Sequence, residues 1–171
     1  MKQALELNVN GQFYEVFAEP WETLANVLRD HLVFKGVRVS CDAGHCGSCT
    51  VLLNGKAVKS CIMLARQAKG KRIITIEGLA GEGKLHPLQE AFIEHYAVQC
   101  GYCTPGMILT AKAILAETPD ATEEEVREGL GGNLCRCTGY KKIVEAILSA
   151  RDRMKKEAKP AHGEGGRVLE E

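Results

Sequence analysis

The stretch Cys41–Cys61 reads CDAGHCGSCTVLLNGKAVKSC and holds half of the eight cysteines of the chain. Its cysteines form a C-x4-C-x2-C array with one more residue after a hairpin-like insert: Cys41, Cys46, Cys49 and Cys61. This is the plant-type ligand spacing of a [2Fe–2S] cluster. Gly44 and Gly47 lie inside the loop, where a missing Cβ lets backbone N–H groups approach the sulfurs. We therefore expect a [2Fe–2S] site in this stretch.

The composition excludes several classes of protein. The 171 residues carry 22 Lys and Arg against 22 Asp and Glu, so the basic excess expected of a nucleic-acid-binding protein is missing. The first residues, MKQALELNVNGQFYEVF, do not resemble a secretory signal, and no apolar run is long enough to predict a membrane span. We expect a cytoplasmic protein, where disulfides are rare and clustered cysteines indicate metal.

The first half of the chain has the hydrophobic alternation of a strand-rich domain. It predicts two hairpins and one further strand: residues 5–9 and 14–18 around Asn10-Gly11, residues 50–53 and 56–58 around Asn54-Gly55, and residues 72–76. Between the hairpins, Thr23–Leu32 changes to a helical period, with Thr23 as its N-cap. These elements predict a domain over residues 1–78.

The glycine-rich segment Gly78–Gly83 marks a boundary, after which the pattern becomes helical. Four helices are predicted from their apolar faces and start signals: one around Leu88, Ala91, Phe92 and His95; one beginning near Pro105 with Lys112 on its outer side; one from the capping box of Thr122 and Glu125 to Gly129; and one from about Tyr140. Short connections between them predict a small helical bundle over residues 79–154 and an α+β fold. We expect the charged tail, residues 155–171, to lie outside the core.

The other four cysteines lie in two predicted turns between helices. Cys100 and Cys103 belong to QCGYCTPG, and Cys135 and Cys137 belong to GGNLCRCTG. Two turns at one end of a bundle can face each other across a metal. A four-cysteine zinc site is the main alternative, because Zn²⁺ accepts four thiolates. Zinc sites more often combine two wider spacings than C-x-C, so the pattern favours iron–sulfur.

The remaining polar residues form no catalytic pattern. His45 lies in the first cysteine loop, but no matching His motif supports a Rieske centre. The other histidines are scattered, and we interpret them as surface or capping residues: His31, His86, His95 and His162. The sequence has no Ser/His/Asp array, P-loop or GxGxxG motif that would act on a substrate.

Three motifs, CDAGHCGSCTV, VQCGYCTPGM and GNLCRCTGY, together resemble the small iron–sulfur subunit of the molybdenum hydroxylases. This is the xanthine oxidase family, which includes aerobic carbon monoxide dehydrogenase. The resemblance covers about Leu5 to about Arg151 and accounts for every cysteine. It implies a plant-ferredoxin-like β-grasp domain with one [2Fe–2S] cluster, then a C-terminal four-helix bundle with a second. The implied ligands are Cys41, Cys46, Cys49 and Cys61 for the first cluster, and Cys100, Cys103, Cys135 and Cys137 for the second.

The resemblance also implies partners and a role. A large subunit with a molybdopterin cofactor would lie beside the second cluster, and a medium subunit with FAD would face the first. Gln99 would hydrogen-bond the pterin, and Cys137 would approach its amino group. The chain would pass single electrons between the two partners, usually in a dimer of heterotrimers, and would not be catalytic alone. The substrate stays open among carbon monoxide, aldehydes, purines, N-heteroaromatics and aromatic acyl-CoA thioesters. The alternative is a free-standing ferredoxin-like carrier fused to a structural zinc module.

Overall fold

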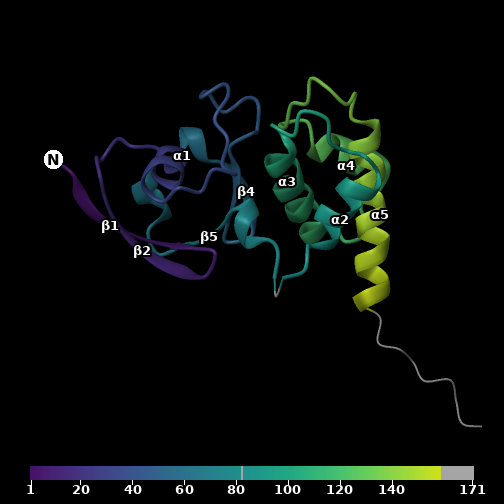
Figure 1. Ribbon diagram of the computed structural model, residues 1–171, viewed down its shortest axis with the longest axis horizontal. Coiled ribbons are helices and arrows are strands. Elements are labelled where there is room, and N and C mark those ends of the chain that lie inside the picture. Colours follow the sequence, from purple (N-terminus) through teal and green to yellow (C-terminus); the bar gives the residue numbers. More distant parts are fainter. Residues whose placement is uncertain (82, 159–171) are drawn as a thin grey trace, which may run out of the picture.

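A computed structural model describes residues 1–81 and 83–158. The strands and the short helix α1 lie on one side of the molecule, and helices α2 to α5 lie on the other (Figure 1). Each side has its own cluster of buried apolar residues. The architecture is α+β, as predicted, and none of the described helices is long and apolar enough to span a bilayer.

The first half is built on a mixed five-stranded sheet in the order β2-β1-β5-β3-β4. Its strands are β1 (Gln3–Val9), β2 (Gln12–Ala18), β3 (Thr50–Leu53), β4 (Lys56–Lys59) and β5 (Arg72–Ile74). The central pair β1 and β5 is parallel, and the other neighbours are antiparallel. Three short 3₁₀ turns complete this half: Ser60–Ile62, Ala65–Ala68 and Ile76–Gly78.

Both predicted hairpin turns are confirmed. Asn10 and Gly11 have φ values of 54° and 84°, and Asn54 and Gly55 have 51° and 85°. A type I′ turn needs positive φ at both central positions, which Asn-Gly adopts at low cost. The turns set the register of β1 with β2 and of β3 with β4.

The strand predicted at residues 72–76 is shorter than expected, because it ends at Ile74. The side chain of Asn10 forms hydrogen bonds with both the backbone and the side chain of Thr75, the residue that follows the strand. Thr75 N donates to Asn10 Oδ1 at 2.9 Å, and Asn10 Nδ2 donates to Thr75 Oγ1 at 3.0 Å. These bonds take the place of a strand partner for Thr75, and the 3₁₀ turn follows.

The helix predicted from Thr23 changes its type after one turn. Thr23 is the N-cap, with its hydroxyl accepting from Asn26 N at 3.2 Å, and α1 (Leu24–Asn26) follows. Residues 27–31 then form a π turn, in which Leu32 N donates to Val27 O at 3.1 Å. In an α-helix, Leu32 N would donate to the carbonyl of Leu28. Here that carbonyl accepts from Phe34 N at 2.8 Å.

The second half contains four helices, as predicted: α2 (Pro87–Glu94), α3 (Thr104–Glu117), α4 (Glu123–Gly129) and α5 (Lys141–Ala158). The capping box is present, with Glu125 N donating to Thr122 Oγ1 at 3.3 Å and Thr122 N donating to Glu125 Oε2 at 2.7 Å. Helix α5 reaches four residues into the predicted tail, and Lys155 pairs with Asp120. The rest of that tail, residues 159–171, lies outside the described residues.

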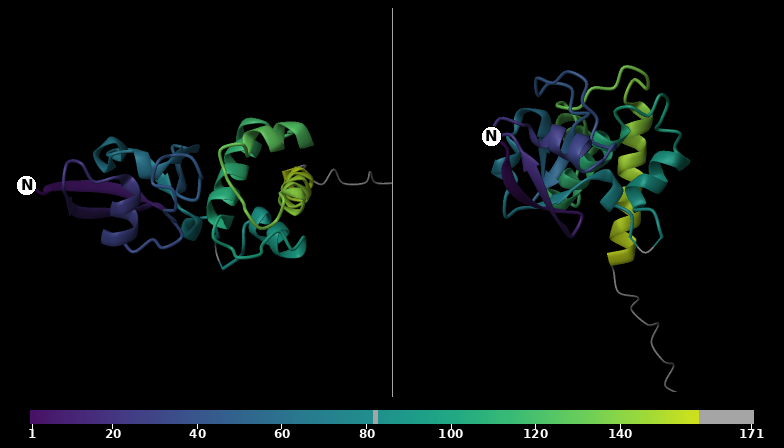
Figure 2. Two further views of the ribbon diagram at one scale, coloured as in Figure 1. Left: turned by 90° about the horizontal axis from the view of Figure 1, so that it is seen from above. Right: turned by 60° about the vertical axis from the view of Figure 1, so that its left-hand side comes forward.

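The expectation that Lys112 lies on an outer side of α3 is wrong, because this helix is covered on more than one face. All residues from Pro105 to Ala111 are buried, and Lys112 is half-buried. One face of α3 packs among the helices, and the other contacts β3, whose Leu52 joins the helical core. Figure 2 shows α3 on the side of the helical half that faces the sheet. Helix α3 therefore connects the two halves.

The N-cap of α2 gives a prediction on acid stability. His86 Nδ1 accepts from Leu88 N at 3.2 Å, and Lys112 Nζ lies 3.1 Å from His86 Nε2. Burial, followed by the charge of Lys112, lowers the pKa of His86 to about 4. The unfolded chain binds this proton near the ordinary value of about 6.5, so stability should fall between about pH 6.5 and pH 4.

His86→Asn keeps a capping side chain without a titrating ring. We expect its thermal midpoint to fall less than that of the wild type between pH 7 and pH 5. Equal falls in the two proteins would contradict this assignment.

Candidate metal centres

The first cysteine loop presents Cys41 to backbone donors. Its Sγ accepts from the N–H groups of Cys46 at 3.3 Å and Ala43 at 3.4 Å. These two bonds, together with the side chain of Cys46, lower the pKa of Cys41 to about 6. The loop therefore stabilises a thiolate, the form of cysteine that binds metal.

The other two cysteines of this set are buried, with Cys49 2% and Cys61 4% exposed. Burial, followed by the side-chain interaction with Cys49, raises the pKa of Cys61 to about 11. Binding a metal through two thiolates at this depth would require a compensating positive charge, which iron would supply. By the side chains that act on each thiol, Cys41 is therefore grouped with Cys46, and Cys61 with Cys49.

The second set lies in the loops before α3 and before α5, as the sequence predicts. Cys100 Sγ and Cys137 Sγ are 3.5 Å apart at the exposed edge. Cys103 contacts Cys135, and burial followed by this contact raises the pKa of Cys103 to about 12. This set is also divided into two pairs, one outer and one inner.

The pairing of the sulfurs is what a two-iron cluster needs. Each iron of a four-cysteine [2Fe–2S] centre takes two thiolates, whereas one zinc ion needs four thiolates converging on a point. All eight cysteines belong to the described residues, and each is a free thiol. The residues present therefore fit [2Fe–2S] clusters.

The two cysteine loops touch each other. Leu134 N, one residue before Cys135, donates to the carbonyl of Cys46 at 2.8 Å. A cavity of about 280 Å³ opens between the loops, lined by Cys46 and all four cysteines of the second set. In Figure 1 the blue loop before β3 and the green loop before α5 lie beside each other at the top.

Asn133 ties the loops together, and the sequence analysis missed it. The side chain is 2% exposed, and its Nδ2 donates to Gly47 O at 3.2 Å. Its Oδ1 accepts from Thr110 Oγ1 and from Lys59 Nζ, both at 3.1 Å. A single asparagine has no sequence pattern that would reveal this, since Gly47 lies 86 positions away.

A second link crosses the junction between Arg38 and the turn of Cys100 and Cys103. Arg38 Nη1 donates to Gly101 O at 3.0 Å, and its guanidinium lies 5.3 Å from the centre of the Tyr102 ring. Tyr102 Oη donates to Val39 O at 2.7 Å. The cysteine loops of the two halves are therefore fixed to each other at two places.

The predicted partner-facing residues lie at the surface. Gln99 is exposed next to Cys100, and Cys137 is exposed as well. The prediction that the scattered histidines are surface or capping residues is confirmed for His86, which caps α2. His31 pairs with Glu22 at 2.9 Å. His45 is an exposed loop residue. His162 lies outside the described residues.

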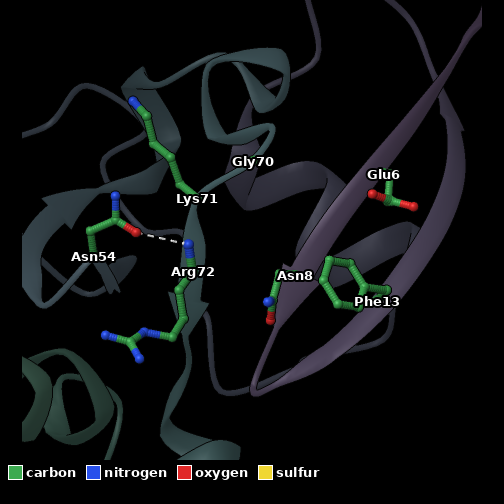
Figure 3. A pocket seen from close by; sticks show the side chains of 7 residues that line it. All are labelled: Glu6, Asn8, Phe13, Asn54, Gly70, Lys71 and Arg72. Atoms are coloured by element: carbon green, nitrogen blue, oxygen red, sulfur yellow. Dashed lines mark hydrogen bonds between the residues drawn. The ribbon is translucent and has the colours of Figure 1, made fainter.

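A separate hollow of about 330 Å³ lies on the sheet half, between the first hairpin and the start of β5 (Figure 3). It is lined by Glu6, Asn8, Phe13, Asn54, Gly70, Lys71 and Arg72. Arg72 N donates to Asn54 Oδ1 at 2.9 Å, which closes one side. No cysteine is among the described residues that line it, so it is distinct from the metal centres.

Comparisons with known proteins agree with this geometry. Residues 8–94 match the family described as 2Fe-2S iron-sulfur cluster binding domain, and residues 75–148 match the family described as [2Fe-2S] binding domain. The chain is 50% identical to the nicotinate dehydrogenase small FeS subunit of Eubacterium barkeri over 152 residues, covering 89% of this chain and 97% of that protein.

Two further relatives extend the comparison. The xanthine dehydrogenase iron-sulfur-binding subunit of Escherichia coli O157:H7 is 45% identical, over 84% of this chain and 91% of that one. A chain of quinoline 2-oxidoreductase from Pseudomonas putida 86 superposes with a TM-score of 0.86 at 43% identity, covering 91% of this chain and 97% of that chain. With two cysteine sets in paired geometry and relatives matched over nearly their full length, the chain belongs to the small iron–sulfur subunits of the molybdenum hydroxylase family.

Proposed function

We propose that the chain passes single electrons between a molybdopterin centre in a large subunit and FAD in a medium subunit. Residues 1–78 would form a β-grasp domain with one cluster, and residues 79–154 a four-helix bundle with the other. The assembly would be a dimer of heterotrimers in the cytoplasm. Substrate would be oxidised in the large subunit, so this chain needs no acid, base or nucleophile of its own.

The observation that supports this proposal most is the direct contact between the two cysteine loops. The hydrogen bond from Leu134 to Cys46 joins the backbone beside one ligand of each set. Both sets also have an exposed edge, Cys41 on one and the pair Cys100 and Cys137 on the other. Two cysteine sets whose loops touch and which each expose cysteine sulfur at the surface suit an electron path through the chain.

We assign the ligands residue by residue. Cys41, Cys46, Cys49 and Cys61 would hold the N-terminal cluster, and Cys100, Cys103, Cys135 and Cys137 the C-terminal cluster. Each [2Fe–2S] cluster supplies one-electron redox chemistry when bound. The chain's own residues hold the thiolates in pairs and donate backbone N–H groups to the exposed sulfur of Cys41.

The experiment that tests the proposal is an analysis of iron, acid-labile sulfide and zinc in the purified full-length chain. About four iron and four sulfide per chain without zinc would support two [2Fe–2S] centres. About two iron and one zinc would support the alternative, a ferredoxin-like carrier with a zinc module. That result would contradict the proposed role beside a molybdopterin centre.

Gln99 gives a prediction on the assembled enzyme. Its exposed amide stands one residue before Cys100, where it would hydrogen-bond the pterin of the large subunit. Gln99→Ala should lower turnover about three- to tenfold, the equivalent of one hydrogen bond, and leave both reduced-cluster EPR signals unchanged. Normal turnover in this variant would remove the assignment.

A further inference from the structure

We infer that Lys59 sets the reduction potential of the N-terminal cluster, because its ammonium is fixed beside that cluster by the other half of the chain. The inference rests on the proposed function, since it requires a cluster on Cys41, Cys46, Cys49 and Cys61. It assigns a role to a residue that lies outside the ligand motifs. The claim concerns the position of a charge and needs no change in protonation.

Lys59 is the last residue of β4, two positions before Cys61, and it is half-buried. Its Nζ does not extend freely into solvent. It donates to Gly132 O at 2.6 Å and to Asn133 Oδ1 at 3.1 Å. Both acceptors belong to the loop between α4 and α5, so the strand half provides the cation and the helical half holds it.

The two groups that accept hydrogen bonds from Lys59 are themselves fixed. Asn133 is buried and also bonds Gly47 O, within the first cysteine loop, and Thr110 Oγ1 on α3. At Gly132, a Cβ would stand only 3.2 Å from Lys59 Nζ, so a side chain there would crowd the ammonium. The ammonium is therefore held in one place relative to the first cysteine loop.

Burial lowers the pKa of Lys59, and the four cysteines of the N-terminal set oppose this by favouring its charged form. Adding one electron to a cluster bound by these thiolates raises the local negative charge by one unit, and no bond forms or breaks. A cation held nearby and partly shielded from water stabilises the reduced state more than the oxidised state. Lys59 should therefore raise the potential of this cluster and favour the electron on it.

The test is a redox titration of the full-length chain carrying both clusters, followed by EPR. Lys59→Met removes the charge and the donors, Lys59→Gln removes the charge and keeps a donor, and Lys59→Arg keeps both. Lys56→Met is the matched control, because Lys56 is an exposed cation on the same strand. Signals are assigned to the two clusters by the cysteine variants described in the Discussion.

We expect Lys59→Met and Lys59→Gln to lower the reduced-to-oxidised ratio of the N-terminal cluster about tenfold at a fixed potential, which is a fall of about 59 mV in the reduction potential of a one-electron couple. Lys59→Arg and Lys56→Met should stay within about twofold of the wild type, and the C-terminal cluster should shift less than the N-terminal one. An unchanged N-terminal potential in Lys59→Gln would overturn the inference, as would equal shifts of both clusters. One EPR signal or bound zinc in the wild type would instead overturn the proposed function.

Discussion

Cys135→Ser is expected to abolish one of the two reduced-cluster EPR signals and to lower iron from about four to about two atoms per chain. The sulfur of Cys135 contacts Cys103 and lies 3.1 Å from Thr138 Oγ1, so it belongs to the inner pair of the second set. A serine hydroxyl at neutral pH is a much weaker ligand than a thiolate. The measurement is EPR of the dithionite-reduced chain with iron analysis on the same sample.

Cys49→Ser provides the reciprocal variant, because Cys49 is the buried partner of Cys61 in the first set. It should abolish the other signal and keep the one that Cys135→Ser removes. Two unchanged signals in either variant would contradict the ligand assignment. Loss of the same signal in both would show that the two sets do not hold separate centres.

Gly106→Ala is expected to destabilise the chain strongly, although it lies inside helix α3. Helix propensity alone would favour alanine by about 1 kcal/mol. A Cβ at this position, however, would stand 2.2 Å from the carbonyl oxygen of Gly47, which is backbone of the first cysteine loop. Overpacking of this kind costs about 1–3 kcal/mol, or roughly 2–12 °C in thermal midpoint for a chain of this size.

Gly81→Ala is the matched control, because a Cβ there meets nothing within 4 Å. Its midpoint, followed by the visible absorbance of the clusters in the full-length chain, should stay close to that of the wild type. Gly106→Ala should also release the N-terminal cluster faster, since its loop must shift. A midpoint at or above the wild type in Gly106→Ala would refute the close contact of α3 with Gly47.

Features of the fold that depend on local interactions could be predicted from the sequence. Each Asn-Gly turn needs only its own two residues to adopt positive φ. The capping box of Thr122 and Glu125 closes within one helical turn. The paired cysteines also depend on short spacings, so their loops and the helices beside them could be predicted.

The features that could not be predicted from the sequence depend on interactions between distant segments. The strand after Arg72 ends early because Asn10, 65 positions before Thr75, replaces its strand partner. The two-sided burial of α3 depends on the sheet half, which a helical period does not reveal. Lys59 and Asn133 meet across 74 positions, and neither residue stands in a pattern that predicts the contact.

The bond between Leu134 and Cys46 has a consequence for how such enzymes can diversify. It fixes the spacing of the two cysteine loops within a single polypeptide, so no neighbouring subunit has to set that spacing. Under the proposed function, a change in the substrate pocket of another subunit would leave the spacing of these two loops as it is.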